Sequence, residues 1–303
     1  MSGRNKKGRD INGIVLLDKD SGLSSNAALQ KVKRLFFAKK AGHTGSLDPL
    51  ASGILPICLG QATKIAGLLL DEYKRYHVRG ALGIFTSTGD SEGEVTERHP
   101  FEHIPETDIV TAVESFVGNI EQIPPMYSAL KRQGTPLYKL ARKGIEIERD
   151  PRPVIIHEIN YIGYSDGILT LDVKCSKGTY IRTLIEDIGK KLGCGAHVIE
   201  LRRTGFSHID ISQTTNLSEL EELISEDYSL LDDKVIATED MLPTLTKVYL
   251  DESQSIDIRF GRKIDTSNNT EPGLVRMFDE KQIFLGIGTS QSDGTITTKR
   301  LFV

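Results

Sequence analysis

The sequence predicts an α+β protein: a mixed, largely antiparallel sheet with flanking helices, followed by a small β-rich C-terminal domain. Strand and helix patterns alternate irregularly, without the strict β-α-β order of a parallel sheet. From residue 246 the chain consists of short strand patterns separated by Gly and Asn turns. Its 303 residues leave room for one large domain or two ordinary ones. We therefore expect a larger domain at residues 1–245 and a smaller one at residues 246–303.

The N-terminal elements follow from apolar spacing and capping residues. The apolar run Ile14–Lys19 predicts a buried strand, and Ser24 or Ser25 then caps a helix that reaches about residue 37. Beyond a glycine-rich loop, residues 61–72 predict a second helix. Alternating apolar positions in residues 74–84 predict a strand.

The middle of the chain predicts two further helices and a pair of strands. Residues 107–117 form an amphipathic helical pattern, and a proline-broken loop at residues 122–132 precedes a helix around residues 137–143. Residues 154–161 and 169–175 alternate like paired strands.

The remaining elements are a strong helix, a strand, an acidic helix and the tail. Residues 178–182 open a helix because apolar residues recur at helical spacing through Leu192. We expect a strand at residues 198–203 and one acidic helix at 217–225, with polar connections around it. In the tail, strands are expected at residues 247–250, 273–278, 282–286 and 295–302.

Cysteine usage and apolar run length predict the compartment. Cys58, Cys175 and Cys194 are odd in number and widely spaced, which favours reduced thiols over a disulfide framework or a zinc site. The first ten residues lack the apolar core of a signal peptide, and the longest apolar runs are too short to span a bilayer. We therefore expect a cytoplasmic protein that does not enter a membrane.

Charge is distributed unevenly along the chain. The net charge is −4, yet residues 1–45 hold ten Lys/Arg against three Asp/Glu, and residues 215–240 hold nine Asp/Glu against one lysine. Such runs usually form solvated faces. The alternative is that the first segment neutralises phosphates, which the second cannot do.

The most informative stretch is residues 41–53, which contain three glycines, His43 and Asp48. Glycines at this density allow positive φ angles or a close approach to a ligand. Because Asp48 precedes Pro49, it is held on a shaped loop and not within a helix. Most Asp-Pro pairs merely cap a turn, so the loop alone leaves both a structural and a catalytic role open.

Arg182 is the natural partner for this carboxylate. It lies near a helix N-terminus, the unfavourable end of the dipole for a cation, so its position needs a reason. A bidentate ion pair with Asp48 would provide one, and we expect that pair to depress the pKa of Asp48. Tyr76, Tyr180 and Leu201 are further candidates, although each could equally be an ordinary core residue, and His43 an ordinary turn residue.

These residues belong to a set of motifs that resembles the TruB family of tRNA pseudouridine synthases, in the order of the bacterial members. The resemblance is close over about residues 10–205, thin through the acidic segment and loose in the tail. The motifs are Gly13–Lys19, Gly22–Asn26, the Asp48 loop, Gly60–Lys64, Lys74–Tyr76, Ile123–Lys131, Ser176–Arg182 and Leu201–Arg203.

The resemblance implies a pseudouridine synthase fold with a PUA-like, RNA-binding C-terminal domain. It implies isomerisation of uridine-55 in the T-arm loop of tRNA, with Asp48 as nucleophile at either the sugar C1′ or uracil C6. Tyr76 would stack on the flipped uracil and serve as base for the C5 proton, and Arg182 would hold and ionise Asp48. By the same resemblance, His43 would fill the gap left by the base, and Tyr180 and Leu201 would line the pocket. Lys64 would contact a phosphate.

Two other catalytic motifs match the sequence only in part. Two G-x-S-x-G matches, at residues 89–93 and 163–167, are followed by strand patterns and so are not hydrolase elbows, and residues 42–46 lack the Gly-Lys-Ser/Thr of a P-loop. The rivals that remain are a non-catalytic tRNA-binding or tRNA-folding module and a pseudouridine synthase for another RNA. We expect no metal or organic cofactor, tRNA as partner and, by default, a monomer.

Overall fold

The computed structural model describes residues 8–226, 228–266 and 271–302. A mixed sheet of eleven strands runs through the larger part of the chain in the order β14-β1-β3-β12-β4-β11-β10-β7, with β2, β13 and β15 attached at its sides. These strands are β1 (Gly13–Lys19), β2 (Ala41–His43), β3 (Ser52–Leu59), β4 (Lys74–Leu82), β7 (Gly118–Gln122), β10 (Arg152–Ser165), β11 (Ile168–Cys175), β12 (Ala196–Phe206), β13 (Ile209–Asp210), β14 (Thr215–Asn216) and β15 (Val235–Ile236).

Most neighbouring strands pair antiparallel, which confirms the predicted fold class. β4 lies between β11 and β12 and pairs antiparallel with both along almost its whole length. Parallel pairing occurs where β12 meets β3, through Arg202 opposite Ser52, and where β1 meets β14. The short contact between β12 and β3 joins the two halves of the sheet at the point where β3 begins.

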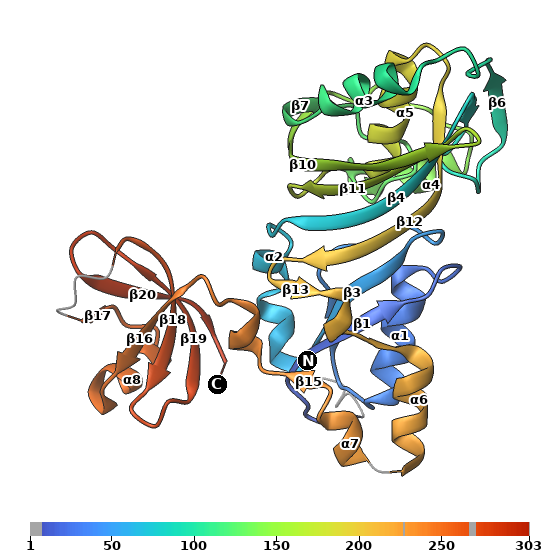
Figure 1. The fold of residues 1–303 in the computed structure, drawn as a ribbon. Coiled ribbons are helices and arrows are strands. Elements are labelled where there is room, and N and C mark those ends of the chain that lie inside the picture. The colour runs from blue at the N-terminus through green and yellow to red at the C-terminus, as the bar shows by residue number, and fades with distance from the viewer. Residues whose placement is uncertain (1–7, 227, 267–270, 303) are drawn as a thin grey trace.

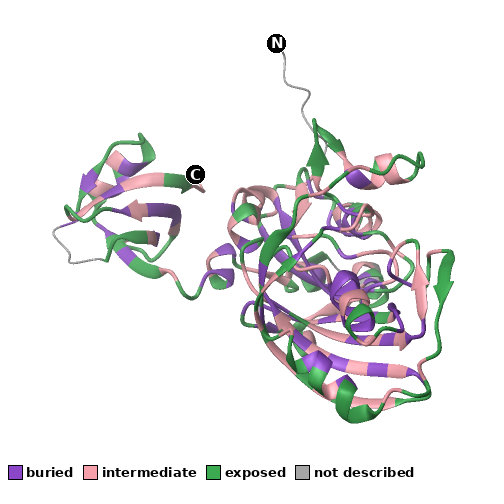
Figure 2. Cartoon of the chain, turned by 90° about the horizontal axis from the view of Figure 1, so that it is seen from above, coloured by how far each residue is buried: buried purple, intermediate pink, exposed green. Residues whose placement is uncertain are grey.

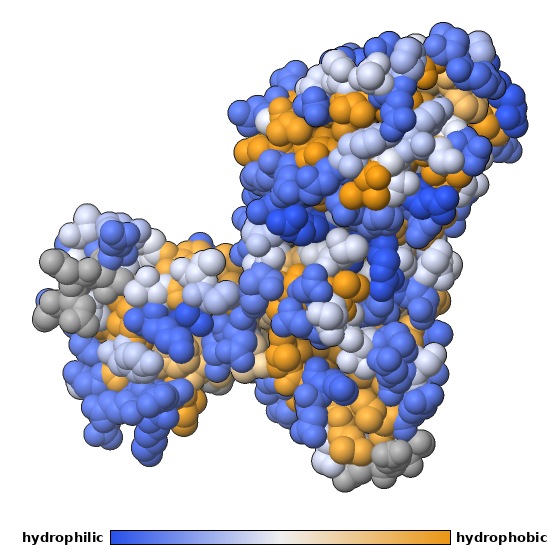
Figure 3. Space-filling view, viewed as in Figure 1, coloured by the Kyte–Doolittle hydropathy of each residue, from blue (hydrophilic) through white to orange (hydrophobic). Residues whose placement is uncertain are grey.

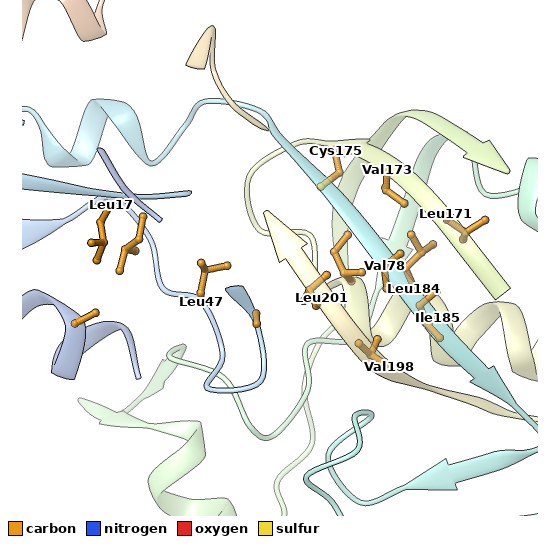
Figure 4. Packing of buried hydrophobic residues seen from close by; sticks show 14 of the residues in the cluster. Leu17, Leu47, Val78, Leu171, Val173, Cys175, Leu184, Ile185, Val198 and Leu201 are labelled. Atoms are coloured by element: carbon orange, nitrogen blue, oxygen red, sulfur yellow. The ribbon is translucent and has the colours of Figure 1, made fainter. Parts of the chain in front are cut away.

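Helices cover one face of this sheet. They are α1 (Ser25–Leu35), α3 (Glu106–Glu114), α5 (Ile181–Lys191) and α6 (Leu217–Glu226), whose apolar residues form one continuous core with the strands. Figure 4 shows Leu47 from the loop before β3 in the same core as Leu201, Val78 and Leu184 from β12, β4 and α5. Figure 2 shows buried residues gathered between the sheet and these helices, with exposed residues along the outer hairpins.

Short elements cover the other face and the periphery. Alternate residues of β1 point to the two faces, so that Val15 and Leu17 join the core beneath α1, whereas Ile14 and Leu16 join a second core. The remaining elements of this part are η1 (Gly60–Lys64), α2 (Ala66–Leu69), β5 (Ile84–Thr86), β6 (Val95–Arg98), β8 (Lys131–Arg132), β9 (Thr135–Pro136), α4 (Leu137–Ala141), η2 (Ile211–Gln213), α7 (Tyr228–Asp232) and η3 (Thr238–Met241).

Residues from 246 onwards form a separate five-stranded sheet, in the order β16-β18-β19-β20-β17. Its elements are β16 (Thr246–Leu250), α8 (Glu252–Arg259), β17 (Ile264–Asp265), β18 (Gly273–Asp279), β19 (Phe284–Ser290) and β20 (Thr295–Leu301). Ile287 packs into the second core of the larger part, and the Arg276 guanidinium donates to the carbonyls of Glu239, Pro243 and Leu245. Figure 3 shows this sheet projecting sideways, with a broad recess between it and the upper half of the body. The domain boundary at residue 245 stays a prediction.

Three expected elements differ from the structure. Residues 61–72 do not form one helix but a 3₁₀ turn, η1, followed by the four-residue α2, because Gly60 adopts φ +55° and the Gln61 N–H bonds to the Asn12 side chain. The acidic stretch contains a second short helix, α7, in addition to the predicted one. In the tail, β19 begins at Phe284 and not at residue 282, because Gln282 is a turn residue with φ +62°.

The tail also contains a helix that the turn-rich pattern concealed. α8 begins with a capping box, in which Asp251 accepts from the Gln254 N–H and the Gln254 side chain accepts from the Asp251 N–H. This Asp-x-x-Gln spacing was the available sequence signal.

The acidic and basic segments partly neutralise each other. α6 lies beside α1 and α7 lies beside α6, and Arg9 forms an ion pair with Asp232 while lying 4.9 Å from the Tyr228 ring centroid. Arg4, Lys6 and Lys7 of the basic segment lie outside the described residues. Lys19 is fully buried and donates to backbone carbonyls. Less of the segment 1–45 is therefore available to phosphates than its composition suggested. No helix in the described part of the chain is long and apolar enough to cross a membrane.

Candidate active site

The loop that carries Asp48 is fixed by the connection between β1 and α1. The hydroxyl of Ser25, the first residue of α1, donates to the Leu47 carbonyl at 2.9 Å and accepts from the Leu47 N–H at 2.7 Å. The Gly22 N–H donates to the Pro49 carbonyl at 2.8 Å, and the Ala51 N–H closes a turn onto the Asp48 carbonyl. The carboxylate is thus held on a rigid loop, as expected for a group that must meet a substrate in one geometry.

A glycine brings this loop against β12. Gly53, at the start of β3, adopts φ +100°, and a Cβ atom there would lie 2.3 Å from the Arg203 carbonyl oxygen. Only glycine allows the two backbones to approach so closely. This contact places the Asp48 loop beside the end of β12 that carries Leu201 and Arg203.

The predicted ion pair between Asp48 and Arg182 is present. Arg182 Nε lies 2.9 Å from Asp48 Oδ2, and Nη2 donates to Asp48 Oδ1 at 3.3 Å. The guanidinium also donates to the carbonyls of Thr88 and Tyr127, each at 2.8 Å, and Nη1 lies 3.4 Å from Asp90 Oδ2. Together these contacts engage all three nitrogens of the guanidinium. Arg182 is therefore locked in place, with only 5% of its side chain exposed.

The expected pKa of Asp48 was wrong in direction. Burial raises the pKa of the Asp48 carboxyl, and the negative charge of Asp90 adds to this, whereas Arg182 and Lys19 act in the opposite direction. The cost of taking a carboxylate out of water outweighs its attraction to one guanidinium that is shared with Asp90. Arg182 thus opposes protonation of Asp48 without bringing its pKa below the ordinary value.

Five of the predicted residues line one cavity of about 290 Å³, near the lower end of the range for small-ligand pockets. They are Asp48, Tyr76, Tyr180, Arg182 and Leu201. Leu201 on β12 pairs with Val78 on β4, and Tyr180 directly precedes α5. The Gln122 side chain fixes the Tyr180 backbone by accepting from its N–H at 2.9 Å and donating to its carbonyl at 3.2 Å. Residues from four separate segments therefore converge on the carboxylate.

His43 and Lys64 do not line this cavity. His43 lies on β2 opposite Ile57, and burial together with the nearby charge of Arg203 lowers its pKa, so the ring is neutral at pH 7. Lys64 lies on η1, where its ammonium donates to the Leu301 carbonyl at 2.5 Å and lies 5.6 Å from the Phe302 ring centroid. Both roles implied by the family resemblance stay predictions.

The hydrogen bond of Lys64 to the Leu301 carbonyl is expected to stabilise the folded protein. Replacing Lys64 with methionine should lower the free energy of unfolding by roughly 1–2 kcal/mol, because a charged hydrogen bond between η1 and β20 is lost. Urea unfolding measures this effect, with Lys40→Met, at an exposed lysine, as the matched control. The contrary outcome would be a variant that keeps full stability but binds RNA with a shallower dependence on salt, corresponding to the loss of about one phosphate contact. Lys64 would then be a phosphate ligand instead.

Sequence reasoning missed three residues of the site. Asp90, only 2% exposed, lies in the G-x-S-x-G match at residues 89–93, and its carboxylate accepts from the Thr88 hydroxyl at 2.5 Å and the Glu92 N–H at 3.1 Å. Tyr127 contributes a backbone carbonyl, which no side-chain pattern reveals. Arg203 is only 1% exposed and lines the cavity. Its place in the Leu201–Arg203 motif was the one available signal.

Comparison with known proteins assigns the family. The model of the N-terminal domain of the TruB family of pseudouridylate synthases matches residues 33–181, and the models of two C-terminal domains, of tRNA pseudouridylate synthase B and of pseudouridine synthase II TruB, match residues 182–243 and 246–302. The chain belongs to the TruB family. Pseudouridine synthases are isomerases, and the chain is therefore an isomerase.

Relatives within the TruB family align over nearly the whole chain. tRNA pseudouridine synthase B of Pasteurella multocida is 48% identical over 298 residues, covering 98% of this chain and 97% of the relative. tRNA pseudouridine synthase B of Haemophilus influenzae (strain PittEE) is 49% identical over 290 residues, covering 95% and 94% of the two chains.

Solved structures support the fold. A chain in the crystal structure of a Cbf5-Nop10-Gar1 complex superposes with a TM-score of 0.73 at 25% identity, covering 96% of this chain and 85% of that one. A chain of the archaeal box H/ACA sRNP Nop10-Cbf5 complex superposes with a TM-score of 0.71 at 23% identity, covering 100% and 93%. These likenesses, with the family model for the tail, confirm the pseudouridine synthase fold and its PUA-like C-terminal sheet.

Proposed function

We propose that this TruB-family chain converts uridine-55 in the T-arm loop of tRNA to pseudouridine, with Asp48 as the nucleophile. The observation that carries the proposal is a carboxylate held bidentately by a buried arginine in a cavity that is also lined by Tyr76, Tyr180 and Leu201. Its relatives are named tRNA pseudouridine synthase B, which supports tRNA as the substrate.

The size and lining of the cavity suit one extruded base. A base stacked within an RNA loop must leave the stack before an enzyme can reach its glycosidic bond, at a cost of a few kcal/mol. Stacking on Tyr76 would return about 1–3 kcal/mol of that cost. Tyr180 and Leu201 would enclose the base, and His43 would fill the gap that it leaves.

The chemistry is assigned to the chain's own residues. Asp48 attacks C1′ of the sugar or C6 of the uracil, the ring turns, and C5 replaces N1 as the atom bonded to the sugar. Attack requires the ionised carboxylate. The Arg182 fork stabilises this ionised form and so opposes the rise in pKa that desolvation causes. Tyr76 then accepts the proton that C5 loses.

A pair of stem-loops tests the assignment. A T-arm stem-loop that carries C5-tritiated uridine should release tritium when incubated with the wild-type chain, whereas an anticodon stem-loop of equal length should release none. Binding of the T-arm RNA without tritium release would favour a non-catalytic RNA-binding module. Release from the anticodon stem-loop at an equal rate would favour a synthase for another RNA.

A further inference from the structure

Two neighbouring arginines on β12 occupy opposite faces of the sheet. Arg202 points away from the cavity, where Nη2 pairs with Asp18 Oδ2 at 2.5 Å and Nη1 donates to the Ser52 hydroxyl at 3.2 Å. Arg203 points into the cavity and is only 1% exposed. The first arginine thus has an ordinary structural partner, whereas the environment of the second requires a separate explanation.

Arg203 is a buried cation without a carboxylate partner. Its Nε donates to the Ile54 carbonyl at 2.6 Å, and its guanidinium lies 5.8 Å from the Phe206 ring centroid. None of the carboxylates in the described part of the chain forms an ion pair with it, and Nη2 has no hydrogen-bond partner there. Burying an uncompensated charge is costly, so such a group calls for an explanation beyond stability.

The group that faces this charge is Tyr76. Arg203 on β12 and Tyr76 on β4 are direct antiparallel partners, so their side chains leave the sheet on the same face as neighbours. Both line the cavity that contains Asp48, so the guanidinium and the phenol lie on one face of the sheet within that cavity. Because the Gly53 backbone packs directly against that of Arg203, the pair is also tied to the strand that follows the Asp48 loop.

The other groups around Tyr76 disfavour its ionised form. Burial raises the pKa of the Tyr76 phenol, and the nearby Asp48 and Cys175 act in the same direction. The positive charge of Arg203 acts in the opposite direction and lowers that pKa. Lys74, on the same strand as Tyr76, donates to the carbonyls of Leu70 and Glu72.

We propose that Arg203 is a positioning residue that holds the hydroxyl of Tyr76 and stabilises its phenolate, so that Tyr76 can accept the C5 proton. This inference rests on the proposed function and deepens it. After C5 has bonded to the sugar, it carries both that bond and its hydrogen. The C5–H bond then breaks, its electron pair enters the ring and the proton passes to the phenolate oxygen, while N1 of the product receives a proton from solvent.

The pH dependence of tritium release in single-turnover reactions tests this role. Replacing Arg203 with glutamine removes the charge, so less Tyr76 is ionised at a given pH, and release should slow about tenfold or more near pH 7. Because burial raises the pKa of Tyr76 above its ordinary value of 10, the ionised fraction rises in parallel in both proteins up to about pH 9, and the deficit should shrink only as pH passes that value. Arg203→Lys should show a smaller shift in the same direction, and the matched control Arg202→Lys should show none.

The same variants distinguish the outcomes. If wild type is active and both Arg203 variants keep the wild-type rate, or lose a factor that stays unchanged above pH 10, the inference is wrong although the proposed function stands. If Arg203→Gln does not fold, as judged by circular dichroism, Arg203→Lys decides in the same way. In a Tyr76→Phe background, Arg203→Lys should cause no further slowing, and a further slowing would contradict action through Tyr76.

A measurement that needs no activity separates this inference from the proposed function. Ultraviolet difference titration of wild type against Tyr76→Phe reports ionisation of this one phenol. The same difference in an Arg203→Lys background should show ionisation at higher pH. An unchanged titration would overturn the inference even if the chain proved inactive on the T-arm RNA.

Discussion

Replacing Asp48 with asparagine is expected to abolish turnover, with a loss of more than about 10⁴-fold, while RNA affinity stays within a fewfold of wild type. Asparagine keeps the size and hydrogen-bonding capacity of the side chain but cannot act as a carboxylate nucleophile. Arg182 keeps its bonds to the Thr88 and Tyr127 carbonyls and its contact with Asp90, so the cavity should stay formed. Tritium release measures turnover, and a gel-shift assay measures affinity.

The pH profile of the wild-type chain provides a second test of Asp48. Only the ionised carboxylate attacks, so activity should fall as pH decreases through its pKa. Because burial raises the pKa of Asp48, the midpoint of that acid limb should lie above the ordinary value of 3.8. Substantial activity in Asp48→Asn, or an acid limb below the ordinary value, would show that another group is the nucleophile.

Replacing Arg182 with lysine is expected to reduce the rate at least about a hundredfold, or roughly 3 kcal/mol in the barrier. A lysine ammonium is a compact point charge and cannot reproduce a planar fork that reaches Asp48, Asp90 and two carbonyls together. With this fork lost, the Asp48 carboxyl is less well stabilised in its ionised form, so the acid limb should also move to higher pH.

The matched control for this substitution is Arg79→Lys. Arg79 pairs with Glu200 at 3.2 Å on a surface where both side chains are about half exposed, and such pairs contribute at most about 1 kcal/mol. We expect that variant to keep wild-type activity. Near-normal activity in Arg182→Lys would mean that bidentate geometry is not what the site requires.

The pairing of Asp48 with Arg182 was predictable because each residue carried a local anomaly. Asp48 lies in an unusually glycine-rich loop, and Arg182 lies at the wrong end of a helix for its charge. Asp90 carried no such signal, because an aspartate in a turn is ordinary and only its burial beneath Arg182 reveals its role. The pKa of Asp48 could not be predicted either, since it depends on burial and on Asp90.

The fold was predictable for elements with long, consistent periodicity. α5 and the pair β10–β11 lie where apolar spacing placed them, whereas the order of strands in the sheet depends on contacts between distant segments. The pairing of β12 with both β4 and β3 is such a contact, and it brings Arg203 next to Tyr76. No spacing within either segment encodes that neighbourhood.

The most direct test of the central claim is to map pseudouridine in a full-length, unmodified tRNA after incubation with the wild-type chain. Reverse transcription after chemical labelling of pseudouridine locates the product at single-nucleotide resolution, and a parallel reaction with Asp48→Asn controls for background. The account predicts one new pseudouridine, at position 55, which is absent with the variant. A bound but unmodified tRNA, a pseudouridine at another position, or the same product from Asp48→Asn would contradict it.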